Sequence, residues 1–272
     1  MDSKDLVPWK DLLANPGPDG HIVQLYQDPH FYGEAISHFA AEGIVRGESI
    51  ILVATAPNWD NISRRLTTKG LDTARLQRLG QLTVLDADRT LPKFLRNNLP
   101  HGETFKAIAR STIQKARAGG KYPRVRWWGE MVNVLYVNGN GRGSTRLEDL
   151  FDEVAHEEEI AIFCSFLMDK FDRSIYDGPL GDVCRTHRNL IPAQDETFHR
   201  QCVDQAVLDV FGGIQSSFLR AIAGSPLQKS AQMPAAQELL FSLKQSAPEK
   251  FDLVLAAARR VESAARTGGS RG

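Results

Sequence analysis

The sequence predicts an α/β fold, a three-layer sandwich with a mostly parallel central sheet, followed by a carboxyl-terminal helical extension. Between residues 21 and 168, short β-branched and aromatic runs alternate with stretches whose apolar residues recur every three or four positions. This alternation is typical of strands and helices in a parallel sheet. Residues 160–167 form an almost uninterrupted apolar run, too short for a membrane span, as expected for a strand covered on both faces. Beyond Met168 only helical patterns recur.

The strands follow one another along the chain with helices between them. Strands are predicted at residues 21–26, 49–54, 82–85, 124–129 and 160–167. The apolar stripes of the intervening helices begin at Phe31, Trp59, Phe105, Met131 and Leu147. Because parallel strands need crossover connections, these helices are expected to cover both faces of the sheet.

The two helices before the apolar strand flank the glycine-rich segment GNGRG, residues 139–143. The first is expected to end at Asn138, and the glycine-rich segment to be an exposed connection. Thr145 and Glu148 have the spacing of a capping box, so the second helix is expected to start there. One face of that helix is predicted to be buried by Leu147, Leu150, Phe151 and Val154.

Composition narrows the classes of partner. The 33 basic and 33 acidic residues give a formal net charge of zero, so no overall field attracts the chain to nucleic acid or to an anionic membrane. No stretch has the length and apolarity of a signal peptide or a membrane span, and three cysteines are too few for a disulfide framework. We therefore expect a cytoplasmic protein that binds neither nucleic acid directly nor a membrane.

Several blocks of the sequence resemble a known family. The segments GEMVNVLY, LEDLFDEV and IAIFCSF, preceded by HIVQLYQDPHFYGEAISHFAAEGIVRGESIILVAT, are similar in order and spacing to the MEDS family over about residues 18–170. That family comprises sensory domains prototyped by a regulator of dichloromethane dehalogenation. The resemblance implies a degenerate RecA- and KaiC-like fold that senses a small molecule, with simple hydrocarbon derivatives as the ligand class. We expect no cofactor.

The resemblance and the patterns together divide the chain into four parts. Residues 1–17 are predicted to be a flexible lead-in with one amphipathic turn around Leu12 and Leu13, 18–177 a MEDS-like sensory domain, 178–266 a helical extension and 267–272 a disordered tail. The extension presents apolar stripes to a sheet that already has enough helices, so it is expected to contact a second copy of the chain or a signalling or transcription-regulatory protein. A chain ending near Asp172 is accordingly expected to stay folded.

The loop after the first strand differs from the phosphate-binding loop of the related ATPases. It reads YQDPHFYGEA and lacks the GxxxxGK[ST] pattern, and one glycine cannot supply the ring of backbone amides that holds a triphosphate. We therefore expect no nucleotide hydrolysis and no catalytic residues.

A ligand pocket is predicted where the strands end, because parallel sheets bind ligands outside the carboxyl ends of their strands. Tyr26, Trp128 and Glu130 are the candidate ligand-binding residues there, with Cys164 on the neighbouring strand. His21 is a further candidate, although it opens its strand and so lies at the opposite edge unless that strand is short. One interpretation is that Tyr26, Trp127, Trp128 and Phe163 form an aromatic wall of this pocket. The alternatives are that Glu130 only stabilises a helix amino terminus and that these aromatic residues are core.

One further pattern has the spacing of a zinc site. Cys184-x-x-His187 and His199-x-x-Cys202 are two pairs of suitable ligands separated by 11 residues. However, His199 and Cys202 fall at the start of a predicted helix beside its apolar stripe. We expect no metal at these four residues.

These observations favour a non-catalytic sensory or regulatory module that binds a small molecule and signals through protein contacts. A protein-docking scaffold without a metabolite ligand is the alternative, and a divergent ATPase is the third reading.

Overall fold

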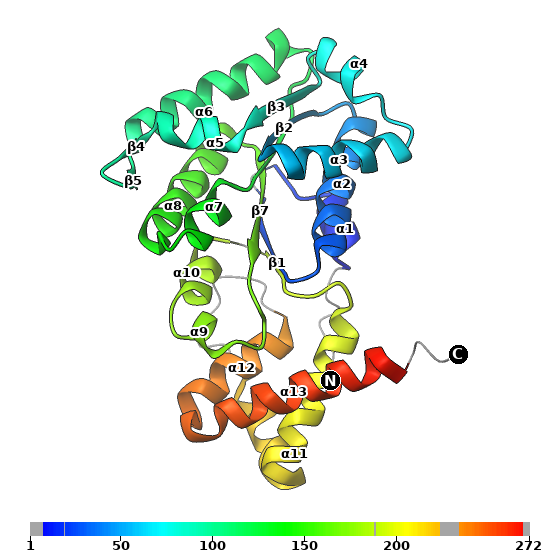
Figure 1. The fold of residues 1–272 in the computed structure, drawn as a ribbon, viewed down its shortest axis with the longest axis vertical. Coiled ribbons are helices and arrows are strands. Elements are labelled where there is room, and N and C mark those ends of the chain that lie inside the picture. The colour runs from blue at the N-terminus through cyan, green and yellow to red at the C-terminus, as the bar shows by residue number, and fades with distance from the viewer. Residues whose placement is uncertain (1–7, 19, 188, 224–233, 269–272) are drawn as a thin grey trace.

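The computed structural model describes residues 8–18, 20–187, 189–223 and 234–268, and its centre is a six-stranded sheet (Figure 1). The strand order is β3-β2-β6-β7-β1-β8, and every neighbouring pair is parallel. The predicted α/β class is therefore confirmed. The strands are β1 (His21–Tyr26), β2 (Ser49–Ala54), β3 (Leu82–Asp86), β6 (Val125–Gly129), β7 (Ala161–Leu167) and β8 (Asn189–Ile191), with a separate antiparallel pair β4 (Leu95–Arg96) and β5 (Leu99–Pro100).

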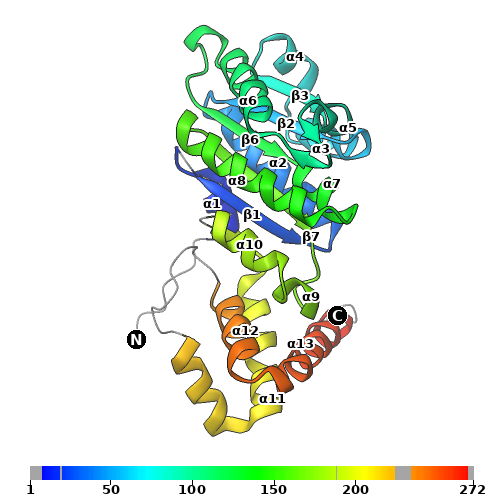
Figure 2. The ribbon, with the colours of Figure 1, turned by 90° about the vertical axis from the view of Figure 1, so that its left-hand side faces the viewer.

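Helices cover both faces of the sheet, as the crossovers require (Figures 1 and 2). One face carries α1 (Trp9–Ala14), α2 (Pro29–Val45) and α3 (Ala56–Thr68), with α4 (Thr73–Arg78) near its edge. The other carries α5 (Ala87–Thr90), α6 (Gly102–Ala116), α7 (Met131–Val137) and α8 (Gly141–Glu158). Each face has its own buried apolar cluster. None of the described helices is both long and apolar enough to cross a membrane.

The predicted flexible lead-in contains the ordered helix α1. Trp9 and Leu13 are buried on this helix, and Trp9 packs edge-on against Phe31 of α2 with ring centroids 5.5 Å apart. The Arg126 guanidinium of β6 donates hydrogen bonds to the carbonyl oxygens of Leu13 and Ala14. The amphipathic turn predicted around Leu12 and Leu13 is therefore present, but residues 9–14 pack against the sheet domain and are not a flexible lead-in.

Helix α8 begins earlier than predicted. Its amino-terminal cap is Asn140, whose side-chain oxygen accepts a hydrogen bond from the Gly143 N–H at 3.0 Å. A Cβ at Gly143 would lie 2.5 Å from the Asn140 side chain, so only glycine fits beside this cap. The residues of the predicted exposed connection thus open the helix, and Thr145 and Glu148 lie inside it instead of forming a capping box.

The region after β7 contains a strand that the sequence analysis missed. After α9 (Arg173–Tyr176) and α10 (Pro179–Thr186), the three residues of β8 pair with β1 at the edge of the sheet. A strand this short carries too few residues to show alternation. The chain then continues into α11 (Glu196–Ala223), α12 (Ala235–Ser246) and α13 (Pro248–Gly268), which gather beyond the β1 side of the sheet (Figure 2).

The carboxyl-terminal helices share a core with the sheet domain. Their buried residues belong to the same apolar cluster as α6, α7 and α8. Phe251 of α13 packs edge-on against Tyr176 of α9 at 5.2 Å between centroids, and Lys170 after β7 forms a 2.9 Å ion pair with Glu262. The apolar stripes that we predicted to face a partner are thus largely covered within the chain.

Candidate functional site

The five predicted ligand-binding residues lie in two separate places. Successive residues of a strand point to opposite faces, so Tyr26 and Trp128 face α2, whereas His21 and Cys164 face α8. Glu130 follows β6 and belongs with the first group, because its carboxylate contacts the side chains of that face.

The same alternation separates the two tryptophans. Trp127 packs against Phe151 of α8 with centroids 5.8 Å apart, while Trp128 packs against Tyr32 of α2 at 5.9 Å. Phe163 lies on the α2 face against Phe39. The prediction of one aromatic wall that contains both tryptophans is therefore wrong. Each tryptophan ring is part of the core on its own face of the sheet.

Glu130 is a buried carboxylate whose oxygens already accept hydrogen bonds from the chain. The donors are the Tyr32 hydroxyl at 2.9 Å, the Thr55 backbone N–H and the Asn58 side-chain amide. Tyr26 stacks on Tyr32 with ring centroids 4.3 Å apart. Burial, and next the Glu130 carboxylate, raise the pKa of both tyrosines, which keeps their hydroxyls protonated and the Tyr32 hydroxyl a donor to Glu130.

A Tyr32→Phe substitution should lower the free energy of unfolding by about 1.5 to 3 kcal/mol, because it removes a hydrogen bond to a buried charged acceptor. Chemical denaturation measures this loss. Tyr26→Phe is the matched control: its hydroxyl accepts only a long, 3.4 Å hydrogen bond from Asn133, so its loss should stay below about 1 kcal/mol. Equal losses in the two variants would show that Glu130 does not depend on Tyr32.

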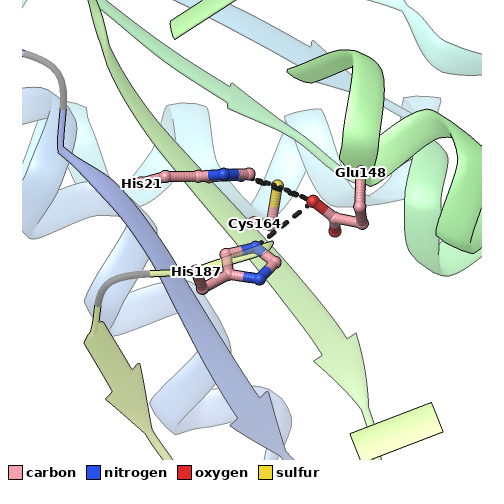
Figure 3. A group of neighbouring side chains, drawn as sticks. All are labelled: His21, Glu148, Cys164 and His187. Carbon is pink, nitrogen blue, oxygen red and sulfur yellow. Dashed lines mark hydrogen bonds and ion pairs between the residues drawn. The ribbon is translucent and has the colours of Figure 1, made fainter. Parts of the chain in front are cut away.

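On the other face, four side chains with metal-binding atoms converge on one point (Figure 3). They come from the start of β1 (His21), the middle of α8 (Glu148), β7 (Cys164) and the residue after α10 (His187), and all are at most 2% exposed. Glu148 Oε2 lies 3.3 Å from His21 Nε2, 3.2 Å from His187 Nε2 and 3.4 Å from Cys164 Sγ. Cys164 Sγ lies 3.6 Å from His21 Nε2. We call these four residues the His–Glu–Cys cluster.

The charges inside this cluster are strongly coupled. Burial alone would raise the pKa of Glu148, but His187 and His21 outweigh it and lower that pKa to about 2. Burial tends to lower the pKa of His21, yet hydrogen bonds to Asp152 and Glu148 raise it overall. Burial and the neighbouring His21 lower the pKa of His187, whereas burial and Glu148 raise that of the Cys164 thiol. Glu148 is therefore a buried anion, and the two histidines stabilise its negative charge.

The structure separates the residues of the predicted zinc pattern. His187 belongs to the His–Glu–Cys cluster, while His199 lies on α11, where its Nε2 is 3.1 Å from Gln237 Oε1 and its ring packs on Phe171. Cys202 is buried on α11 as a free thiol. The Cys184 side chain lies outside the described residues. Among the described side chains, His187 thus has metal-binding neighbours that the sequence pattern did not name.

Sequence reasoning missed Glu148 because its spacing from Thr145 imitated a capping box. The signal that was present is its position between Leu147 and Phe151 on the inward face of α8, where a charged residue needs a partner.

A cavity of about 520 Å³ lies beside the cluster, between α7, α8, α10 and the carboxyl end of β7. Its wall is mixed: aromatic and aliphatic side chains lie beside hydroxyl and carboxylate groups and the arginines Arg142 and Arg146. Glu148 is shared between the cavity and the His–Glu–Cys cluster. The principal lining residues are Tyr136, Thr145, Glu148, Phe166, Met168 and Val183.

The sequence of the chain matches a known family of sensory domains. No curated protein matches the chain. The family model MEDS, the methanogen/methylotroph, DcmR sensory domain, matches residues 20–188. This range contains strands β1 to β7 and all four residues of the His–Glu–Cys cluster, whereas α11, α12 and α13 lie beyond it. The chain belongs to the MEDS family of sensory domains.

Proposed function

We propose that this sensory module binds a small molecule in the cavity between α7, α8 and α10 and signals through its carboxyl-terminal helices. The observation that carries the proposal is the cavity itself. Its volume of about 520 Å³ lies within the usual range for ligand sites, roughly 300 to 1,000 Å³, and its mixed wall combines the buried carboxylate of Glu148 with the apolar side chains of Phe166 and Met168. Such a wall suits a small, partly apolar molecule, such as a hydrocarbon derivative that carries a hydroxyl or amine.

The contacts of α10 supply a route for the signal. The Thr145 hydroxyl of α8 is 3.3 Å from Asp182 Oδ2 of α10, so a molecule that separates these helices moves α10. Asp177, just before α10, forms a 2.8 Å ion pair with Lys244 of α12. Displacement of α10 is thereby passed to the helices that lie outside the matched sensory domain.

We also propose that the module is not an ATPase. Asp28 caps α2, with its carboxylate accepting a hydrogen bond from the His30 N–H at 2.8 Å, and Pro29 at the first helical position has no N–H to donate. A carboxylate thus occupies the helix end where a phosphate would need amides. Calorimetry with Mg·ATP should detect no binding, and micromolar affinity with turnover would contradict this.

The ligand proposal is tested by a thermal-shift screen of small alcohols, amines, halocarbons and carboxylates. Thr145→Trp places an indole in the cavity wall, so any compound that raises the melting temperature of the wild type should lose that effect. Gln114→Trp, at an exposed position of α6, is the matched control and should respond as the wild type does. The response should also survive in Glu130→Gln, whose carboxylate lies on the other face.

Two outcomes of the screen contradict the proposal. A response that persists in Thr145→Trp places the ligand elsewhere, and one lost in Glu130→Gln places it at the carboxyl edge of the sheet. No response from any compound leaves the docking scaffold as the better account. Leu208 on α11 and Leu253 on α13 favour that second function, because both are large apolar side chains and are 41% and 58% exposed.

A further inference from the structure

Each imidazole ring of the His–Glu–Cys cluster places one nitrogen beside an outer acceptor and the other beside Glu148. His187 Nδ1 lies 2.6 Å from the Val183 carbonyl oxygen, which can only accept, so this nitrogen carries the hydrogen. The Nε2 atom of the neutral ring then presents a lone pair to Glu148 Oε2, another acceptor, 3.2 Å away. Two acceptors at this distance repel each other unless a proton or a metal ion lies between them.

His21 repeats this arrangement. Its Nδ1 lies 3.4 Å from the Asp152 carboxylate, while its Nε2 faces Glu148 Oε2 and Cys164 Sγ. A histidine that holds a metal through Nε2 usually donates its Nδ1 hydrogen to a carboxylate or a backbone carbonyl. Both histidines of the cluster have the outer partner that metal binding requires, one a carboxylate and the other a carbonyl.

The two oxygens of the Glu148 carboxylate have different surroundings. Both imidazoles and the thiol approach a single oxygen, Glu148 Oε2. The second oxygen, Oε1, is buried and has no hydrogen-bond partner among the described residues. A hydrogen-bonded network would divide its donors between the two oxygens, because an unsatisfied buried carboxylate oxygen is costly. The approach of two imidazoles and a thiol to one oxygen instead places four ligand atoms close enough together to share a cation.

We propose that His21, Glu148, Cys164 and His187 bind one zinc ion. Zinc in proteins is tetrahedral with bonds of about 2.0 to 2.3 Å, which places neighbouring ligand atoms about 3.3 to 3.6 Å apart. Four of the six separations within the cluster are 3.2 to 3.6 Å, and the other two, from His187 to His21 and to Cys164, are at most 4.8 Å. The ligand set of two imidazoles, a thiolate and a carboxylate suits zinc.

The charges also balance. On binding, the Cys164 thiol releases its proton to solvent, and the resulting thiolate and the Glu148 carboxylate together neutralise the two positive charges of the ion. The bordering cavity reaches Glu148 and so provides an entry path. The ion joins β1, α8 and β7 to the end of α10, which is the element that leads to the carboxyl-terminal helices.

The test is zinc binding by the full chain, purified reduced, stripped with a chelator and titrated with zinc against a chromophoric competitor. The wild type should bind one zinc per chain. Loss of an outer partner of a ligand typically costs about 10- to 100-fold in affinity, so Asp152→Asn should weaken binding by about 10-fold or more and Cys164→Ser by at least about 100-fold. Cys202→Ser and His199→Gln remove a buried thiol and a buried imidazole outside the cluster, and both should bind as the wild type does.

Cobalt provides a readout that needs no variant. The wild type loaded with Co²⁺ should show the visible bands of a tetrahedral ion together with thiolate-to-cobalt charge transfer in the near ultraviolet. Absence of that charge-transfer band, absence of zinc binding, or loss of zinc in the Cys202→Ser protein would overturn the proposal. Zinc binding is measured with the metal alone, so its failure is distinct from a failure of the ligand screen.

Discussion

An Arg126→Met substitution should lower the free energy of unfolding by about 3 to 5 kcal/mol, the usual cost of breaking a buried ion pair from one side. The Arg126 side chain is 2% exposed and is paired with the buried Glu48 carboxylate. It also donates hydrogen bonds to the carbonyl oxygens of Leu13, Ala14 and Phe39. Methionine fills similar space but leaves the carboxylate and all three carbonyls without this donor.

The Arg126 side chain is also tightly packed against α2. A Cβ at Gly43 of α2 would lie 2.7 Å from Arg126 Cδ, so glycine is needed where the arginine passes the helix toward α1. Arg124→Met is the matched control, because Arg124 pairs with the same Glu48 but is 69% exposed, and exposed pairs contribute about 1 kcal/mol or less. Urea denaturation of both variants gives the comparison. A loss below about 1 kcal/mol in Arg126→Met would show that α1 is not held by this residue.

A chain that ends at Asp172 should fail to fold cooperatively. It lacks β8 and the whole of α9 and α10, and with them the buried side chains of Tyr176, Leu180, Val183 and Leu190. Each such side chain contributes about 1.5 to 3 kcal/mol on burial, so together they contribute on the order of 10 kcal/mol. Domains are typically stable by only about 5 to 15 kcal/mol. This reverses the expectation from the sequence, which treated the extension as separable.

Circular dichroism and size-exclusion chromatography measure the outcome. The shortened chain should show a broad thermal transition and elute as aggregate, because the apolar cluster beneath α9 and α10 is exposed. A chain ending at Arg266 retains every one of these contacts and should melt like the full chain. A sharp transition at the wild-type temperature in the chain ending at Asp172 would show that the sheet domain is complete without its carboxyl-terminal region.

The sheet was predictable because its strands are long, apolar and bounded by turns. All five predicted strands are present, and each occupies the expected residues within one or two positions. The three-residue strand β8 was missed because a periodic pattern needs more residues than it contains, and of α1 only one amphipathic turn was predicted. The start of α8 was misplaced because glycines that normally end helices here accommodate an asparagine cap.

The candidate site was less predictable for a different reason. His21 and Cys164 were named as ligand-binding residues, and His187 as part of a zinc pattern, but nothing in their spacing places them together. The parallel register pairs His21 with Ile162, and that register brings its imidazole beside Cys164 two residues further on. Crossovers of more than a hundred residues create this contact, so only the fold reveals it.

The most direct test of the central claim is native mass spectrometry of the full chain isolated from its source organism. The claim is that the cavity and the His–Glu–Cys cluster beside it form a binding site and are not merely part of the core. We expect the wild type to carry one zinc ion and a non-covalent small molecule, with the zinc lost in Cys164→Ser and the small molecule lost in Thr145→Trp. A wild-type chain with the mass of its polypeptide alone, or with only a partner protein attached, would contradict the account.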